Sequence, residues 1–293
     1  SFSVKAAEEG KNRAHIRFGL GFDEMPYFCT SHAFCKRIMG ISQVMDGKDV
    51  MEFLKEYEFT LSRNHGVGPK AVRSVVQDPY FDIIERAKTN CHSLKDERLS
   101  LDQEQRKGVS SHMLEPIAES WEKFRLSRVP PVYSFADMIN KFLVDGTPPE
   151  LDVLIVDEAQ DLAELNWRLV EKLAQNAGKV YIAGDDDQAI YEWNGAKPQR
   201  FVEYVGEKIV LDQSYRVPSL VHPIAERISE RIISREPKVY KPREEEGTVS
   251  NVSSIELLPL DSGQWLILAS CDYMLNDISK GYNVRKYLID NGY

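Results

Sequence analysis

Two adjacent acids, Asp157 and Glu158, follow directly on the apolar run VLIV at residues 153–156. A short continuous apolar run predicts a buried strand, which would deliver both carboxylates to its carboxyl end. Hydrolysis of a nucleoside triphosphate needs one acid to hold Mg²⁺ and a second to orient or deprotonate the attacking water. Adjacent acids leaving a strand can serve both roles. A solvated turn at a strand end has the same residue types, so this pair alone leaves both interpretations open.

A second polar segment, GDDDQAIYEWNGA at residues 184–196, follows the apolar run VYIA at 180–183. Its Gln188 carries an uncharged amide that can hydrogen-bond a terminal phosphate or the attacking water. Tyr191 and Trp193 are large aromatic residues in a polar loop bounded by glycines, and such residues can act as stacking platforms for unpaired bases. The alternative is that both aromatic side chains anchor the loop to the core.

The third segment is LDQSYRVP at residues 211–218. Arg216 could stabilise charge on a transferring phosphoryl group. Tyr215 could stack on a nucleobase. An isolated tyrosine–arginine pair is, however, more often structural.

The elements that must position these segments follow from the apolar pattern. Apolar runs at 153–156, 180–183 and 209–211 predict strands, and residues 162–177 predict an amphipathic helix with Gly178 as its stop. Strands that alternate with helices predict a buried parallel sheet, in which ligands bind at the carboxyl ends of the strands. We therefore predict an α/β fold with the first two polar segments at one edge of a sheet.

Residues 44–130 carry apolar side chains at three- and four-residue steps and show no strand signal, which predicts an all-helical insertion closed by Pro130 and Pro131. After the third segment, residues 219–235 predict another helix, and 241–247 predict a charged linker or surface turn. Residues 248–293 predict the start of a second α/β unit, with strands near 249–255 and 265–270 and a helix from about 273 to 289.

Composition sets further bounds. The 293 residues include 37 Lys and Arg against 46 Asp and Glu, a net charge of −9 that argues against a generic basic nucleic-acid binder. No apolar run is long enough for a membrane span, and the first residues have no apolar signal-peptide core. We therefore expect a cytoplasmic protein with no membrane partner.

The four cysteines are sparse for this length, which is typical of free thiols in a reducing compartment. Cys29, His32 and Cys35 have metal-like spacing, and Cys91 with His92 could add ligands. Zinc sites usually show paired ligand spacings, so we expect Cys29 and Cys35 to be small buried residues beside a functional loop.

Taken together, the order and spacing of DEAQD (157–161), GDDDQAIYEWNGA (184–196) and LDQSYR (211–216) resemble motifs II, III and IV of superfamily 1A DNA helicases, the UvrD/Rep/PcrA-like group. The segment SFSVKAAEE at 1–9 resembles motif Ia, and TSHAF at 30–34 resembles motif Ib. The segment SFADMI at 134–139 resembles the stretch that precedes motif II. Residues 44–130 match only in their helical character and position.

This resemblance implies a parallel-sheet, RecA-like motor domain of the P-loop NTPase type at residues 1–43 and 131–214. It also implies that residues 44–130 are the helical insertion, and that 215–293 begin a second RecA-like domain. The implied cofactors are ATP and Mg²⁺. The implied substrate is single-stranded DNA or a duplex junction, unwound in the 3′ to 5′ direction by a protein of bacterial or phage type.

The resemblance also implies a role for each matching residue. Asp157 would bind Mg²⁺ and Glu158 would activate water, while Gln188 would sense the γ-phosphate. Tyr215 would stack on adenine, and Arg216 would contact the γ-phosphate. Gln160 and Asp161 would link the nucleotide and DNA sites. The residues implied to line the single-strand path are Phe2, Thr30, His32, Tyr191 and Trp193.

The sequence departs from the family in two places. The phosphate-binding pattern G-x-x-x-x-G-K-[ST] is absent, and GVGPK at 66–70 is no substitute because its spacing is wrong. Asn194 also stands where the family usually has Arg. We therefore expect an internal, monomeric fragment of a longer helicase that alone neither hydrolyses ATP nor unwinds DNA. The alternatives are a catalytically inactive, helicase-like DNA-binding scaffold and the motor part of a helicase–nuclease.

Overall fold

The computed structural model describes residues 4–57, 78–103, 105–106, 108–233, 235–269, 275 and 284–290. The chain divides into two compact units. Unit 1 comprises Ser1–Ile209 with Ile232–Pro237, and unit 2 comprises Val210–Arg231 with Lys238–Tyr293. The described strands form three small parallel sheets, so the protein is of mixed α/β type.

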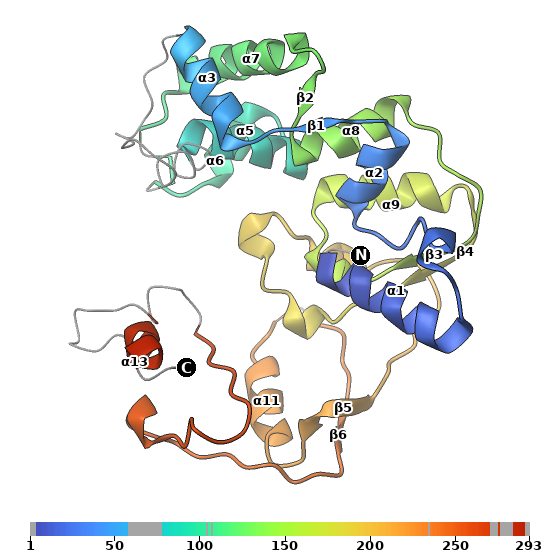
Figure 1. Ribbon diagram of the computed structural model, residues 1–293, viewed down its shortest axis with the longest axis vertical. Helices are drawn as coiled ribbons and strands as arrows, with labels where there is room; N and C mark the ends of the chain where they lie inside the picture. Colours follow the sequence, from blue (N-terminus) through green and yellow to red (C-terminus); the bar gives the residue numbers. More distant parts are fainter. Residues whose placement is uncertain are drawn as a thin grey trace. The chain divides into compact units, whose positions relative to one another are not determined.

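Four helices of unit 1 form what we call the helical block: α3 (Gly47–Tyr57), α5 (Pro79–Asn90), α6 (Leu94–Ser100) and α7 (Ser111–Ser127) (Figure 1). Their apolar faces enclose a core in which Phe53 and Trp121 are almost completely buried. Helix α5 begins after the N-cap Asp78, whose carboxylate accepts from the Tyr80 amide. All described elements between residues 47 and 127 are thus helices, as the periodicity predicted.

A second core of unit 1 lies among α2 (Ser31–Ile38), α8 (Phe135–Asp145) and α9 (Glu164–Ala174) (Figure 1). Helix α8 begins with a capping box in which Ser134 and Asp137 exchange hydrogen bonds with each other's backbone amides. Two short strands, β1 (Gln43–Val44) and β2 (Val132–Tyr133), pair in parallel and flank the helical block in sequence. Among the described residues, this unit also contains the long helix α1 (Val4–Phe18).

The sheet that carries the candidate site consists of β3 (Leu151–Val156) and β4 (Ala177–Ile182), paired in parallel from Leu151↔Ala177 to Val156↔Ile182. This confirms the strands predicted at 153–156 and 180–183. The expected full burial is wrong, because Val153 and Ile155 are 45% and 66% exposed. The reason is that a two-stranded sheet leaves part of its surface uncovered.

The predicted role of Gly178 as a helix stop is also wrong. Helix α9 ends at Ala174, and Gly178 lies inside β4. A Cβ at position 178 would lie 3.0 Å from the carbonyl oxygen of Asp152 on β3. The glycine therefore allows the two strands to approach closely, which is the usual meaning of a glycine within a strand.

Unit 2 departs further from expectation. Its sheet pairs β5 (Gln213–Pro218) with β6 (Lys241–Arg243), so the strand predicted at 209–211 is wrong, and the supposed linker at 241–247 contains a strand. Ile209 and Leu211 are exposed, because an apolar run without a pairing partner forms no ladder. The predicted helix at 219–235 is limited to α11 (His222–Ser229).

In the rest of unit 2, the described residues near 249–255 and 265–269 form no strand, contrary to the prediction. They include the short 3₁₀ helix η5 (Ile255–Leu257), which overlaps the first of those segments. Of the helix predicted at 273–289, the structure describes α13 (Val284–Asp290). Among the described helices of both units, none combines the length and apolar character needed to cross a membrane.

Candidate functional site

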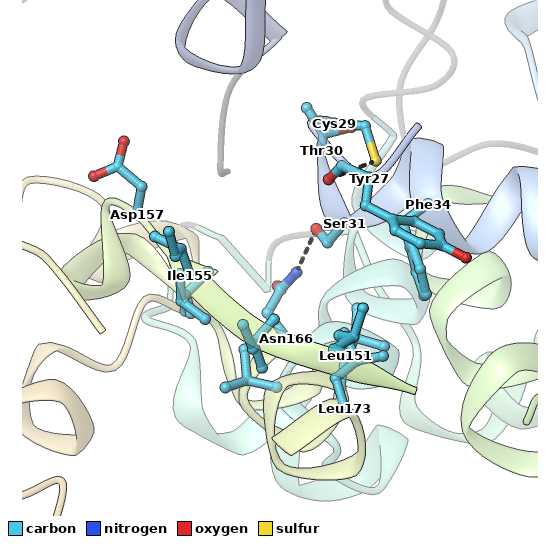
Figure 2. A pocket seen from close by; sticks show the side chains of 15 residues that line it. Tyr27, Cys29, Thr30, Ser31, Phe34, Leu151, Ile155, Asp157, Asn166 and Leu173 are labelled. Atoms are coloured by element: carbon cyan, nitrogen blue, oxygen red, sulfur yellow. Dashed lines mark hydrogen bonds between the residues drawn. The ribbon is translucent and has the colours of Figure 1, made fainter. Parts of the chain in front are cut away.

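The carboxyl ends of β3 and β4 bring the first two polar segments together. The Ala183 amide donates to the Val156 carbonyl (2.8 Å), and the Ala159 amide donates to the Ala183 carbonyl (3.0 Å). Asp157 and Glu158 leave β3 at this edge, and Asp185 follows β4. Figure 2 shows Asp157 at the end of the β3 ribbon, turned away from the apolar side chains near it. The sequence prediction that both acidic segments share one sheet edge is confirmed.

Glu158 has a left-handed backbone conformation, with φ 56° and ψ 44°. This region costs free energy for a residue with a side chain and persists only where neighbouring structure enforces it. Here the chain turns at once into the short 3₁₀ helix η2 (Ala159–Asp161), whose first amide is fixed by β4. The turn therefore sets the direction in which the Glu158 carboxylate leaves the strand.

Gln160 connects the two segments through its side-chain amide and is only 1% exposed. Its Nε2 donates to Glu158 Oε2 (2.8 Å), and its Oε1 accepts from the Asp185 amide (3.0 Å). A Cβ at Gly184 would lie 2.5 Å from that same Oε1. The glycine at 184 is thus required for this close approach.

The connection continues within the second segment. Gln188 Nε2 donates to Asp185 Oδ2 (2.5 Å), and Asp185 Oδ1 accepts from the Asp187 amide (3.2 Å). These residues belong to or cap the 3₁₀ helix η3 (Asp186–Gln188). We call the chain of contacts Glu158–Gln160–Asp185–Gln188 the polar path. It joins the end of β3 to the loop that follows β4.

The acids at the end of β3 repel one another. Burial first, and then the neighbouring Glu158 carboxylate, raise the pKa of Asp161 to about 6. Asp161 Oδ1 is buried without a hydrogen-bond partner among the described residues. The region therefore carries more negative charge than its local donors neutralise, which favours a cation nearby.

Three further acids cluster after β4. The carboxylates of Asp185, Asp186 and Asp187 lie within 4.8 Å of one another. Asp187 accepts two hydrogen bonds from the Arg235 guanidinium (2.7 and 2.6 Å), and Asp186 accepts from the Glu236 amide (2.6 Å). These donors stabilise the acids within unit 1. Sequence reasoning missed Arg235, which lies 48 residues away and shows no local signal.

The aromatic pair lies on the loop beyond the polar path. Trp193 is part of the 3₁₀ helix η4 (Glu192–Asn194) and is 68% exposed, while Tyr191 is half-buried. Their ring centroids are 6.3 Å apart. The exposure of Trp193 excludes the alternative in which its ring anchors the loop to the core. The loop is held instead by the Trp193 carbonyl, which accepts from Arg86 Nη1 (2.8 Å).

Thr30 and His32 lie at the start of α2. Thr30 Oγ1 accepts from the Ala33 amide (3.2 Å) as the N-cap, and His32 packs edge-on against the Phe135 ring at 5.2 Å. Burial lowers the pKa of His32, which favours a neutral imidazole at pH 7. Phe2, the other predicted path residue from this end of the chain, lies outside the described residues.

A cavity of about 110 Å³ separates α2 from β3 and α9, and Ser31 is hydrogen-bonded to Asn166 across it at 3.1 Å (Figure 2). Pockets for small molecules are usually at least about 300 Å³. We therefore assign no ligand to this cavity. Cys29 borders it and is only half-buried, so its predicted burial is wrong; its thiol donates to the Tyr27 carbonyl (3.7 Å).

Cys35 is fully buried, as predicted, and burial, together with the nearby Cys29, raises its thiol pKa to about 12. Such a thiol is inert and unsuited to binding a metal as a thiolate. Tyr215 and Arg216 lie on β5 in unit 2, and both side chains are exposed. Glu158, Gln160 and Gln188 thus belong to one hydrogen-bond network of unit 1. The third polar segment, which contains Tyr215 and Arg216, belongs to unit 2.

With small parallel sheets and an acidic site at the carboxyl edge of one of them, the chain is a mixed α/β protein. Residues 1–207 match the family model of the UvrD/REP helicase N-terminal domain. The chain therefore belongs to the UvrD/Rep/PcrA-like family of superfamily 1A helicases.

The relatives include bacterial DNA helicases. The chain is 42% identical over 82 residues to DNA helicase II of Escherichia coli, covering 26% of this chain and 11% of that protein. It is 24% identical over 272 residues to the ATP-dependent DNA helicase PcrA of Bacillus subtilis, covering 84% of this chain and 35% of PcrA. It is 34% identical over 95 residues to the ATP-dependent DNA helicase Rep of Escherichia coli, covering 31% of this chain and 14% of Rep. The matched regions thus span about a third or less of these relatives' length.

Proposed function

We propose that this chain is the N-terminal motor part of an ATP-dependent DNA helicase that moves along single-stranded DNA in the 3′ to 5′ direction. Residues 1–43 and 131–214 form its first RecA-like domain, 44–130 form the helical insertion, and 215–293 begin the second RecA-like domain. The observation that carries the proposal is the polar path. It ties the acid that would activate water to the loop that presents an exposed tryptophan.

The acids at the end of β3 fit Mg²⁺ and ATP. Mg²⁺ prefers carboxylate and water oxygens, and the pKa of Asp161 is raised by its burial and by the neighbouring Glu158 carboxylate. Asp157 would hold the metal through its waters, and the metal would neutralise charge developing on the phosphates. Glu158, oriented by its backbone and by Gln160, would position and deprotonate the attacking water.

Gln188 would sense the terminal phosphate at the far end of the polar path. Tyr215 and Arg216 would supply adenine stacking and a contact to the γ-phosphate from the second domain. Since Gln188 is hydrogen-bonded to Asp185 and thereby to Gln160, a change at the phosphate would reach the loop after β4 through direct contacts.

Single-stranded DNA would pass over the exposed ring of Trp193, with Tyr191 beside it. Stacking contributes about 1–3 kcal/mol per base and tolerates any sequence, as movement along arbitrary DNA requires. Phe2, Thr30 and His32 would line the same path. A neutral His32 would contribute hydrogen bonding rather than charge.

The 293 residues contain no G-x-x-x-x-G-K-[ST] segment, so we propose that this monomeric chain alone neither hydrolyses ATP nor unwinds DNA. A DNA-binding module without catalysis is the second candidate, favoured by the same missing segment. A DNA-stimulated ATPase rate that Glu158→Gln abolishes would contradict the proposed inactivity.

The binding proposal is tested by fluorescence anisotropy of a labelled oligothymidylate with the whole chain. Because Trp193→Ala removes stacking on one base, its affinity for the oligothymidylate should be about 5- to 150-fold weaker than that of the unsubstituted chain. Trp265→Ala is the matched control, since Trp265 is also exposed, at 46%, but lies in unit 2. Equal affinity for the two variants would refute stacking on Trp193.

A further inference from the structure

The backbone of the aromatic loop is held by a side chain of the helical block. Arg86 of α5 donates from Nη1 to the Trp193 carbonyl (2.8 Å) and from Nε to Glu97 Oε1 of α6 (3.0 Å). The contact to the loop spans 107 residues of sequence. One guanidinium therefore connects the loop to two helices, which its planar fork of donors allows and a lysine ammonium would not reproduce.

Glu97 fixes that guanidinium in place. Its side chain is completely buried and also accepts from Asn90 Nδ2 (2.9 Å) and lies 3.0 Å from His92 Nδ1. Burial raises the pKa of Glu97, but the hydrogen bonds from Asn90, Arg86 and His92 together outweigh it and lower the pKa. The carboxylate is therefore ionised at neutral pH, and its partners hold it in one orientation.

A second contact lies two residues beyond Trp193. Gly195 has φ +93°, and a Cβ built there would lie 2.2 Å from Asn90 Oδ1. Asn90 is itself only 7% exposed. Helix α5 thus touches the loop at two places, at the Trp193 carbonyl through Arg86 and at the backbone of Gly195 through Asn90.

These contacts matter because Trp193 is 68% exposed, so few side chains among the described residues can hold its ring in place. The direction of an exposed indole depends on its backbone, and a ring already oriented for stacking loses less entropy when a base binds. We propose that Arg86, Asn90 and Glu97 form a positioning clamp that holds Trp193 ready to stack on a base of single-stranded DNA. This inference rests on the proposed function.

The test combines affinity with a direct report from the ring. The whole chain is labelled with 5-fluorotryptophan, and the Trp193 ¹⁹F resonance is assigned by its absence in Trp193→Phe. Arg86→Gln should weaken oligothymidylate binding about 2- to 10-fold, as expected for one lost hydrogen bond. It should also move or broaden the Trp193 resonance. Arg128→Gln is the matched control, because Arg128 also lies at the helical block but pairs with the exposed Glu52.

A double-mutant cycle separates positioning from general stability. If the clamp acts through Trp193, Arg86→Gln will have no further effect on affinity in the Trp193→Ala background. Additive losses, or an unchanged Trp193 resonance, would overturn the clamp and leave the stacking proposal standing. If Trp193→Ala alone binds normally, the proposed stacking fails, and the clamp's role in binding fails with it.

Gly195→Ala provides a second variant in case loss of Arg86 prevents folding. The added Cβ would collide with Asn90 and displace the loop, while Arg86 and Glu97 keep their ion pair. Weaker DNA binding and a moved Trp193 resonance are expected. A resonance and an affinity that match the unsubstituted chain would overturn the clamp.

Discussion

Replacing Gln160 by methionine removes the amide at the centre of the polar path while keeping a similar side-chain length. Gln160 is 1% exposed, so water cannot readily replace its two hydrogen bonds. The bond to the Glu158 carboxylate corresponds to about 1.5–3 kcal/mol and the bond from the Asp185 amide to about 0.5–1.5 kcal/mol. Gln160→Met should therefore lower the free energy of unfolding of unit 1 by about 2–4 kcal/mol.

Native-state hydrogen exchange in increasing urea measures this effect on the β3 and β4 amides of unit 1 alone. The Asp185 amide should lose protection first, since it donates directly to Gln160. Gln175→Met is the control, because Gln175 is exposed at the end of α9. A loss below about 0.5 kcal/mol, the range of ordinary surface substitutions, would refute the claim that the amide holds the two segments together.

Three further predictions concern unit 1. Burial raises the pKa of Asp137, but Lys88 and Arg125 outweigh it and hold the pKa at about 2. Asp137 therefore stabilises the fold above about pH 4, and this stability is lost as the pH falls toward 2. The urea midpoints at pH 7 and pH 3 should differ less in Asp137→Asn than in the unsubstituted chain. An equal difference in the two proteins would contradict the ion network. Asp161 has a raised pKa of about 6, so its ionised form destabilises the fold at higher pH. Asp161→Asn should raise the urea midpoint more at pH 8 than at pH 5, and a uniform change would argue against this. In Gly146→Ala, a Cβ would lie 2.3 Å from the ring of the fully buried Phe142; calorimetry should show a loss of about 1–3 kcal/mol from overpacking, and an unchanged melting temperature would show that the ring moves freely.

Local patterns predicted much of unit 1. The apolar runs at 153–156 and 180–183 became paired strands, and the acids after them share one sheet edge. Helix α2 begins at Ser31, directly after its N-cap Thr30. These features depend on neighbouring residues in the sequence, so periodicity and capping residues are sufficient to reveal them.

Contacts between distant segments could not be predicted in the same way. The Trp193 carbonyl is hydrogen-bonded by Arg86, and Asp187 is paired with Arg235. Both arginines lie in stretches of sequence that show no functional pattern of their own. Gly178 resembled a helix stop because it follows a helical pattern. Its actual role is to allow the backbone of Asp152 on the neighbouring strand to approach closely. Pairing also decided where β5 begins, since strand partners outweigh local hydrophobicity.

The side-chain amide of Gln160 has a carbonyl oxygen that accepts hydrogen bonds and an NH₂ group that donates them. It can therefore join the two segments in one orientation only. The Asp185 amide can only donate, so the carbonyl end of Gln160 must face it, and the NH₂ end must face Glu158. Glu158 Oε2 is then the acceptor, and Gln160 has no orientation in which its two partners are exchanged. A single buried amide thus joins the loop after β3 to the loop after β4, and it can do so in one orientation only.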